Sequence, residues 1–311
     1  MQLIAIVILG TILGFTYGAY TDGFIFSTNI CLFAGLTLIM PSLFDFEMKD
    51  VKLMWQYKAV MLKGLIVNYL LLPAIAIGIG FMTGDFGIMS GLFLLSVLSG
   101  GGMVMHWINR SGADNSFGFL LLFINLLGIS LSLFMLHIFA GYASSYFDLS
   151  YDSDISISRF TQEVVTLLIV IPFIVSRVVL YIKPLETFIR KYRKVISNIS
   201  LFIILFYLFG LQSSQALIEE VWDFNPEFFP IAFAAVFVFY LLVFLLSMWI
   251  YDLDSPQEKA VFWHSVTRYI TLALVISTFS VSTFGVSMLL PIMFAYIVQI
   301  PWAIYISNKV Q

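Results

Sequence analysis

The chain has 311 residues, of which 61% are hydrophobic and 11% are charged, and its formal net charge is -3. Soluble domains carry about a quarter charged residues, and a soluble fold of this length cannot bury so much apolar surface. The composition excludes a soluble globular enzyme, a disordered chain and a nucleic-acid-binding protein, which needs a basic face. It indicates an integral membrane protein.

Ten stretches are apolar enough, at about 20 residues each, to cross a bilayer as helices. They cover residues 2–19, 27–43, 58–82, 86–108, 115–140, 160–182, 195–213, 228–250, 257–279 and 283–307. The N-terminal stretch lacks a basic n-region, so we interpret it as a first span and not as a signal peptide. Because lipid cannot satisfy open backbone groups, the predicted fold is an all-α bundle of ten transmembrane helices.

Lysine and arginine concentrate in loops on one side of this bundle. They are Lys49, Lys52, Lys58, Arg110, Lys183, Arg190, Lys191, Arg193, Lys194, Lys259 and Lys309, whereas the other side has Arg159 and acids such as Asp85, Asp152 and Glu220. The positive-inside rule then predicts that both termini are cytoplasmic. Short loops favour a bacterial inner (plasma) membrane.

The longest predicted external loop, residues 141–158, divides the chain into two halves of five spans. An odd number of spans gives the halves opposite orientations, which is the inverted repeat of secondary transporters. We therefore predict a first repeat over 1–143, a linker over 144–157 and a second repeat over 158–311. In such folds, interrupted helices meet at the substrate site near the midplane.

The fourth span contains Ser99-Gly100-Gly101-Gly102, followed by His106. Each glycine costs a helix about 1 kcal/mol, so this run predicts an opened helix whose backbone lines protein or a water-filled cavity. The alternative is that the glycines only permit close helix packing.

The ninth span contains Arg268, about eleven residues after its predicted start, in a segment that also carries His264, Thr267 and Thr271. An arginine at that depth costs about 2.5 kcal/mol or more and is expected to face the bundle interior. No acid lies near the middle of any predicted span, so its expected partner is a bound anion or opened backbone carbonyls. The alternative is a shorter span with Arg268 snorkelling to the interface. On a continuous helix, His264 and Arg268 would share a face.

Several short motifs recur in the same order as in a known family. They are Gly35-Leu36-Thr37-Leu38, Phe44-Asp45-Phe46, Lys58-Ala59-Val60, Asn68, Leu72-Pro73, Gly91-Leu92, Ser99-Gly100-Gly101, Asp114 and the polar segment from His264 to Ala273. In this order they resemble the bile acid:sodium symporter family and its relatives, the arsenite-efflux permeases. The resemblance implies ten helices in two inverted five-helix repeats, with helices four and nine broken and crossing at the core. It also implies a panel domain that moves against a core domain, and secondary transport of a small organic anion driven by sodium.

The residues that the resemblance assigns to sodium are mostly replaced. The Ser-Asn pair on span four of the family falls on Val104 and Met105, and the family's two hydroxyls on span five fall on Gly118 and Leu122. The family's Glu and Gln on span nine fall on His264 and Arg268. Only the amide on span three persists, as Asn68. Sodium is a hard cation that takes oxygen ligands. We therefore predict that the sodium sites are lost and that Arg268 fills the space with a fixed positive charge.

The single cysteine, Cys31, lies in span two and not in span four, where the arsenite permeases are expected to hold their metalloid ligand. Arsenite export by a thiolate is therefore not expected. One cysteine also excludes a disulfide framework and a cysteine-based zinc site. The motifs of paired intramembrane acids, His-Glu-x-x-His and Gly-x-Ser-x-Gly are missing from the sequence, so an enzyme is not expected.

The leading hypothesis is a sodium-independent secondary transporter of a small organic anion, with its site at the crossing of helices four and nine. The candidate substrate-binding residues are Asn68, Ser99, Gly100, Gly101, Gly102, His106, His264, Thr267, Arg268 and Thr271. His264 or His106 is either a structural histidine or the carrier of a coupling proton. We expect no cofactor, metal or nucleic acid, only the substrate, the bilayer and a proton as a candidate partner. The alternatives are a membrane sensor that does not transport, built on the same fold, and an ordinary sodium-coupled symporter.

Overall fold

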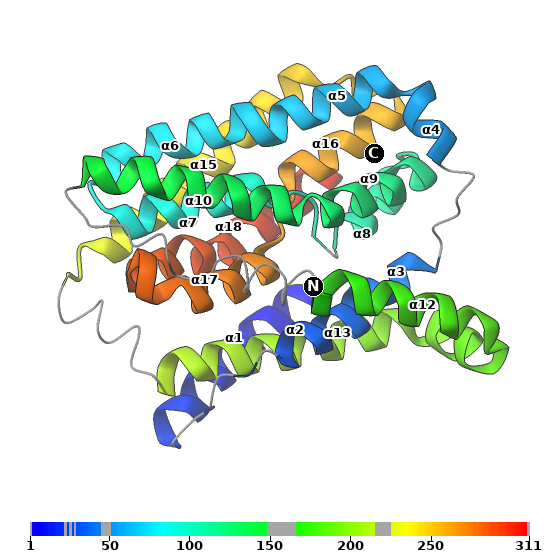
Figure 1. Cartoon of the computed structure of the whole chain (residues 1–311), viewed down its shortest axis with the longest axis horizontal. Coiled ribbons are helices and arrows are strands. Elements are labelled where there is room, and N and C mark those ends of the chain that lie inside the picture. The colour runs from blue at the N-terminus through cyan, green and yellow to red at the C-terminus, as the bar shows by residue number, and fades with distance from the viewer. Residues whose placement is uncertain are drawn as a thin grey trace. The chain divides into compact units, whose positions relative to one another are not determined.

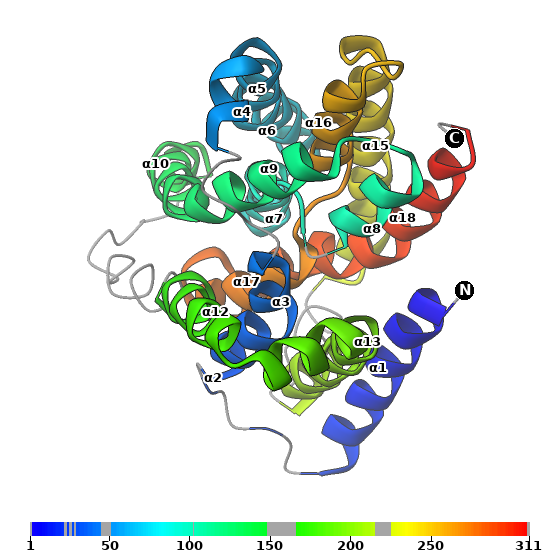
Figure 2. The same cartoon turned by 90° about the vertical axis from the view of Figure 1, so that its right-hand side faces the viewer.

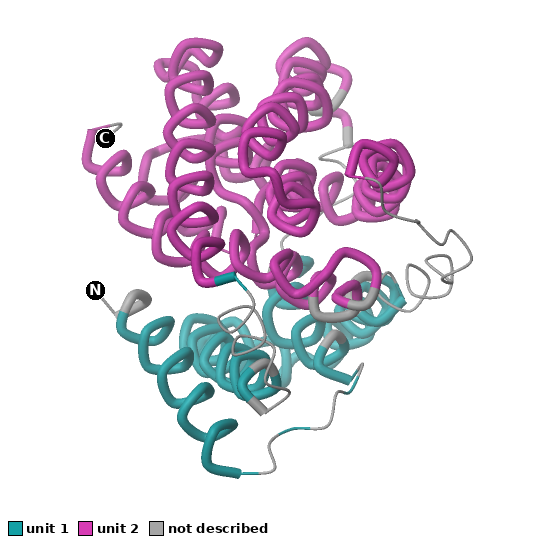
Figure 3. Tube along the Cα trace, turned by 90° about the vertical axis from the view of Figure 1, so that its left-hand side faces the viewer, with its two compact units in different colours: residues 1–45, 156–225 teal, residues 46–155, 226–311 magenta. Residues whose placement is uncertain are grey.

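The computed structural model describes residues 2–21, 24, 27, 29–44, 51–101, 103–147, 166–214 and 225–309. The regular elements in these residues are all helices (Figure 1). They form two compact units, residues 1–45 with 156–225 and residues 46–155 with 226–311 (Figure 3). Each unit draws on both halves of the chain, so the units differ from the predicted division at 144–157, which remains a prediction about internal repeats.

The first unit contains two long helices that lie side by side (Figure 2). Its elements are α1 (Gln2–Tyr20), α2 (Asn29–Ala34), η1 (Gly35–Ile39), α3 (Met40–Leu43), η4 (Thr166–Val170), α12 (Ile171–Tyr181) and α13 (Lys183–Ser214). On α1, Gly10, Gly14 and Gly18 recur every four residues and face α13; a Cβ atom on Gly14 would lie 2.6 Å from the carbonyl oxygen of Phe206. Small residues at this spacing allow two helix backbones to approach closely in a membrane.

The second unit contains the segments that carry the candidate site. Its elements are α4 (Val51–Gln56), α5 (Lys58–Ile66), η3 (Val67–Leu71), α6 (Leu72–Thr83), α7 (Phe86–Val97), α8 (Val104–Arg110), α9 (Asn115–Leu127), α10 (Ile129–Tyr146), α15 (Phe228–Ile250), α16 (Pro256–Val266), α17 (Ile270–Phe284), η5 (Val286–Met288) and α18 (Leu289–Ser307). Side-chain caps set three of the helix starts: Asp85 accepts from the Ile88 amide, Asp114 from the Phe117 amide and Ser255 from the Glu258 amide. Such caps satisfy amides that the first turn leaves open.

Three π-turns precede a proline by the same distance. The turns η1, η3 and η4 end at Ile39, Leu71 and Val170, each two residues before a proline. Proline lacks an N–H group and its ring displaces the carbonyl four residues earlier, and a widened turn accommodates both effects. The turn η3 matters most here, because it contains the buried Asn68.

Five described segments are long and apolar enough to cross a membrane, judged by length and composition. They are Lys58–Thr83, Ile129–Tyr146, Lys183–Leu211, Phe228–Ile250 and Val286–Ser307, and four shorter apolar helices cover Ala5–Tyr20, Phe86–Val97, Asn115–Leu127 and Ile171–Tyr181. An all-helical integral membrane protein is therefore confirmed in outline. The number of ten spans and their inverted repetition remain predictions.

The assignment of the basic residues from Lys183 to Lys194 to a loop between two predicted spans is wrong, because α13 is one helix from Lys183 to Ser214. Glu186 accepts from Lys183 Nζ at 3.1 Å and from Arg190 Nε at 2.9 Å, one turn apart on the same helix. Such pairs support a polar helical extension that hydropathy alone does not detect.

The other boundaries differ by a few residues. Helix α10 extends to Tyr146, into the predicted external loop, and α17 extends to Phe284. Several predicted features lie outside the described residues, namely Gly102, the linker from residue 148 onward, Lys49, Arg159, Asp152 and Glu220.

The contact between α1 and α13 gives a first prediction. Replacing Gly14 by leucine places a side chain against the α13 backbone, so we expect the free energy of unfolding to fall by about 1–3 kcal/mol, the usual cost of overpacking. The matched control is Gly78→Leu, because a Cβ atom there would meet nothing within 4 Å. Thermal unfolding of the two purified variants in detergent measures the difference, and equal melting temperatures would contradict the close packing of α1 on α13.

Candidate functional site

Two helices of the second unit are interrupted, and the interruptions bind each other. One lies between α7 and α8, after Val97, and the other between α16 and α17, after Val266. The Gly100 amide donates to the Thr267 carbonyl at 2.9 Å, and the Tyr269 amide donates to the Leu98 carbonyl at 2.9 Å. Ser99 and Arg268 are thereby paired as an antiparallel β-bridge. This short ladder satisfies backbone groups that neither lipid nor a helix would satisfy there.

Gly100 shows why the glycine run is needed. Its φ is +57°, and a Cβ atom at this position would overlap Nδ1 of His264. Side chains with a Cβ atom rarely adopt such a backbone conformation. At Gly101 a Cβ atom would come within 3.2 Å of the Tyr269 Cα. The two interpretations of the glycines thus both apply, since the run opens the helix and also lets the second break approach it.

The side chain of Arg268 is the most deeply enclosed charge in the described residues, with 1% of its surface exposed. Nε donates to the Leu95 carbonyl at 3.0 Å, and Nη2 donates to the Ser96 carbonyl at 2.9 Å. Nη1 donates to Oδ1 of Asn68 and to the Ser265 carbonyl, both at 2.8 Å. These partners are three carbonyls and one amide oxygen, so Arg268 does not snorkel to an interface.

The acceptors around Arg268 come from helix ends. Leu95 and Ser96 lie in the last turn of α7, and Ser265 lies in the last turn of α16. The last carbonyls of a helix have no partner in that helix and carry about half a negative charge in total. Two such ends facing one guanidinium therefore offset its charge to a large extent without a carboxylate.

The backbone of Arg268 is fixed by a side chain from α18. Oε1 of Gln299 accepts from the Arg268 amide at 2.6 Å, and Nε2 of Gln299 donates to the Arg268 carbonyl at 3.3 Å. The Tyr240 hydroxyl on α15 donates to the same Oε1 at 2.8 Å. Gln299 therefore satisfies the edge of the extended segment that faces away from Ser99.

His264 bridges α16 and α9. Its Nε2 lies 3.0 Å from the Gly118 carbonyl, and its Nδ1 lies 3.0 Å from Nδ2 of Asn125. Nδ2 of Asn125 also donates to Oγ of Ser99 at 3.2 Å, and Ser99 Oγ donates to the His264 carbonyl at 2.9 Å. The Asn125 amide and the Ser99 hydroxyl thus both join the first break to His264.

Helix α16 takes its place beside α9 because the two helix starts are tied together. The Asp114 amide donates to the Pro256 carbonyl at 3.0 Å, and Nε2 of Gln257 donates to Oδ2 of Asp114 at 2.9 Å. Both helices then run side by side from this point, which brings His264 opposite Gly118.

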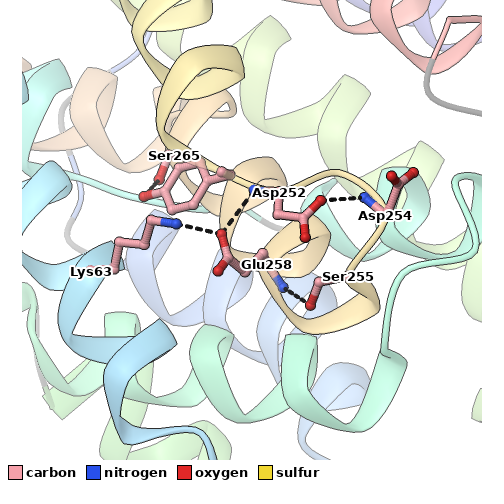
Figure 4. Close-up of polar contacts among 7 residues, drawn as sticks. Lys63, Asp252, Asp254, Ser255, Glu258 and Ser265 are labelled. Atoms are coloured by element: carbon pink, nitrogen blue, oxygen red, sulfur yellow. Dashed lines mark hydrogen bonds and ion pairs between the residues drawn. The ribbon is translucent and has the colours of Figure 1, made fainter.

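The polar network around Arg268 continues toward a charged cluster at the start of α16. Nδ2 of Asn68 donates to Oγ of Ser265 at 3.3 Å, and this hydroxyl lies 2.9 Å from the Tyr251 hydroxyl. Beside Tyr251, Lys63 pairs with Glu258 at 2.5 Å, and Glu258 also accepts from the Asp252 amide at 2.8 Å (Figure 4). Lys63 Nζ lies 5.5 Å from the Tyr251 ring centroid. The ion pair joins α5 to the first turn of α16, and the bond from Asn68 to Ser265 joins later turns of the same two segments.

The structure does not bring all the predicted site residues together. Asn68, Ser99, Gly100, His264 and Arg268 form one contiguous network. The Thr267 carbonyl belongs to the ladder, while its hydroxyl donates to the Trp263 carbonyl within α16.

Two predicted residues lie apart from this network. His106 is exposed on α8, edge-on to the Trp107 ring at 5.0 Å between centroids. Thr271 accepts from the Tyr296 hydroxyl at 2.9 Å. The expected shared face of His264 and Arg268 does not form, because α16 ends at Val266 between them and their partners differ.

Sequence reasoning missed Asn125, Gln299 and Tyr251. Each amide stands out as a polar residue in an otherwise apolar span, which is the signal that could have found it. A second arginine inside a predicted span, Arg177, was also missed. Its Nη2 donates to the Leu43 carbonyl at 2.8 Å, at the end of α3 in the first unit.

The described residues contain no group of three or more His, Cys, Asp or Glu side chains that could hold a metal ion. The oxygens around Arg268 are the ligand type that a hard cation takes. In this structure the guanidinium occupies the centre of that set.

The described residues contain helices that are long and apolar enough to cross a bilayer. Two of the apolar segments are broken at a buried polar network, which is typical of an integral membrane protein of the solute-transporter type. A family model matches residues 32–219, that of the Sodium Bile acid symporter family. The chain belongs to that family, whose members are membrane transporters and not enzymes. No curated protein matches the chain.

The contact between Gly100 and His264 gives a second prediction. We expect Gly100→Ala to lose more free energy of unfolding than Gly112→Ala, because a Cβ atom must displace the imidazole as well as adopt a strained φ. Gly112 is the matched control, since its φ is +69° and a Cβ atom there would meet nothing within 4 Å. The strain alone costs about 1–2 kcal/mol. Thermal unfolding in detergent compares the two, and a Gly112 variant as unstable as the Gly100 variant would contradict the proximity of His264.

Proposed function

We propose that this protein is a secondary transporter of a small organic anion, that it works without sodium, and that it binds its substrate where the two helix breaks meet. The observation that carries the proposal is the position of the Arg268 guanidinium, surrounded by three carbonyl oxygens and the Asn68 amide oxygen. A guanidinium is always charged in proteins, so this cation cannot leave as a bound ion can.

The second substituted position supports the same proposal. In the family resemblance, an acid on span nine and hydroxyls on span five provide sodium ligands, and here these positions hold His264 and Gly118. The imidazole Nε2 lies 3.0 Å from the Gly118 carbonyl. The side chain at the position of the family's acid is therefore bonded to the backbone of Gly118, where the family has a hydroxyl side chain. Two cation-binding positions of the family are thus occupied by side chains from one segment.

Substrate binding at the breaks is supported by the local backbone. Helix α17 begins at Ile270, and its N-cap residue, Tyr269, makes no side-chain cap. The start of a helix carries partial positive charge and open amides, which favour an anion. Thr271 and the Ser99-Gly100-Gly101 segment lie beside this start. The hydrogen bonds of Arg268 go to protein oxygens, so in this proposal it provides charge to the anion and no direct contact.

The topology is part of the proposal. We assign ten helices in two inverted repeats, broken helices that cross, cytoplasmic termini and a bacterial inner membrane. A contact within the second unit supports the placement of two predicted cytoplasmic segments on the same side. Nη2 of Arg110, in the loop after span four, donates to Oδ1 of Asn308 near the C-terminus at 2.8 Å.

Thermal stability of the purified protein tests the function. We expect an organic anion, from a panel assayed in choline chloride, to raise the melting temperature without sodium. A ligand at 100 times its dissociation constant stabilises by about 2.7 kcal/mol. We expect Arg268→Ala to abolish this shift and Arg268→Lys to retain part of it, because lysine keeps the charge. Stabilisation of the unmodified protein by sodium alone would instead identify an ordinary sodium symporter, and anion binding without flux in proteoliposomes would identify a sensor.

Restoring the oxygen ligands gives a fourth prediction. The double variant His264→Glu/Arg268→Gln recreates the two family residues beside Asn68, which still provides its amide. We expect this variant to be stabilised saturably by millimolar sodium but not by choline, while the unmodified protein responds to neither. The single variant Arg268→Gln is the control for removing the charge alone. Sodium stabilisation of the unmodified protein equal to that of the double variant would contradict the replacement of sodium by Arg268.

A further inference from the structure

The hydrogen bonds of His264 define which nitrogen carries its proton. The Gly118 carbonyl can only accept, so Nε2 carries hydrogen and donates to it at 3.0 Å. Nδ2 of Asn125 can only donate, so Nδ1 of the ring accepts at 3.0 Å. Ser99 Oγ accepts from the same Nδ2 while it donates to the His264 carbonyl. This arrangement assigns a neutral imidazole with a lone pair on Nδ1.

We infer that His264 is the coupling site of this transporter, taking up a proton at Nδ1 when an organic anion binds beside Ser99-Gly100-Gly101, so that both cross the membrane in the same direction. This inference rests on the proposed function and makes it more specific. It selects His264 over His106, because His264 bonds to Ser99 and Asn125 at the first break, whereas His106 is exposed on α8.

A proton on Nδ1 rearranges the contacts of the first break. Nδ1–H would face the Asn125 amide nitrogen, which is also a donor, so the amide must rotate and present Oδ1 to the ring. Oδ1 then lies where Nδ2 lay, next to Oγ of Ser99. The Ser99 hydroxyl can donate to it only by leaving the His264 carbonyl. Protonation therefore changes the hydrogen bond that joins the Ser99 hydroxyl to α16.

The charges near α16 explain why the proton and the anion are taken up together. The titratable and charged groups on the elements around α16 are Lys58 and Lys63 on α5, Tyr69 on η3, His106 and Arg110 on α8, Asp114 before α9, Tyr240 on α15, Tyr251, Asp252 and Asp254 between α15 and α16, and Glu258, Lys259, Arg268 and Tyr269 on and after α16. Glu258 pairs with Lys63, and Asp114 accepts from Gln257. Among the described residues, no carboxylate is bonded to His264.

An imidazolium at His264 would be a second buried cation close to Arg268. Burying a charge without a partner of opposite sign is strongly unfavourable. Arg268 alone is offset by the helix ends that surround it, and nothing comparable faces Nδ1. An anion at the first break would provide the missing charge, since Gly100 lies directly against Nδ1. By linkage, the anion then binds more tightly as the pH falls, and the proton more tightly when the anion is present.

Nitrogen NMR of the histidine side chains tests this directly, because the chain has only three histidines. The full-length protein is labelled with ¹⁵N-histidine, and the His264 signal is identified by its loss in His264→Asn. The anions are taurocholate, benzoate and pyruvate, which stay ionised from about pH 5.5 to about pH 8, the range in which free imidazole titrates. We expect His264 to remain protonated only at Nε2 without an anion, and to become protonated at both nitrogens when an anion binds.

A second variant and a flux measurement separate the outcomes. Asn125→Asp places a carboxylate at Nδ1, so we expect a doubly protonated His264 without any anion, even if His264→Asn folds poorly. In proteoliposomes without sodium, an inwardly directed proton gradient should drive accumulation of the bound anion by the unmodified protein but not by His264→Asn. An anion that binds while the His264 signal and the proton dependence stay unchanged overturns the coupling role and leaves the proposed function standing. If none of the three anions changes the melting temperature or the spectrum, the proposed function fails, and the coupling role fails with it.

Discussion

The second unit depends on keeping a full positive charge away from both water and lipid. Arg268 is 1% exposed, and every partner that its guanidinium contacts is an uncharged oxygen. The cost of removing such a charge from water is several kcal/mol even after relaxation. The surrounding chain must therefore bring several acceptors to one point, and regular helices cannot do so because their carbonyls are already bonded.

Interrupted helices provide the acceptors that Arg268 needs, but they also leave other backbone groups without partners. Ending α7 at Val97 and α16 at Val266 frees the carbonyls that Arg268 needs, but it also leaves amides and carbonyls of the connecting segments open. The ladder between those segments, the Ser99 hydroxyl on the His264 carbonyl and the Gln299 amide on the Arg268 backbone satisfy these groups. Glycine at position 100 is required because this closure needs a left-handed backbone and leaves no room for a Cβ atom. The arginine and the breaks thus depend on each other.

Hydropathy and single polar residues were sufficient to predict part of this arrangement. The helix interruption at Ser99-Gly100-Gly101 and the burial of Arg268 follow from residue types that a lipid-embedded helix does not tolerate. The sequence predicted the type of acceptor for Arg268, opened backbone carbonyls, but not the residues that provide them. The available carbonyls depend on where two helices that are distant in the sequence end.

Partner choice was the part that the sequence could not specify. His106 and His264 are equivalent by span and residue type, yet one is exposed on α8 and the other lies against Gly118. The distinction arises from the tie between the starts of α9 and α16, a tertiary contact with no local pattern. The polar N-terminal part of α13 was also missed, because a search for apolar stretches does not detect a helix rich in charges. Charge pairs such as Glu186 with Arg190 support that part of the helix.

A tethered cation changes the energetics of a transport cycle in the proposed function. A carrier that binds sodium loses that charge on release, so the empty carrier returns without it. Arg268 stays in place throughout, and the site keeps its positive charge when the anion leaves. Moving one elementary charge through a membrane potential changes the energy by about 2.3 kcal/mol per 100 mV. An anion bound together with one proton would leave the total charge of the site as it was, so the loaded and the empty carrier would move the same charge in opposite directions. The effect of the membrane potential would then cancel over a complete cycle, and the concentration gradients of the proton and the anion alone would drive transport.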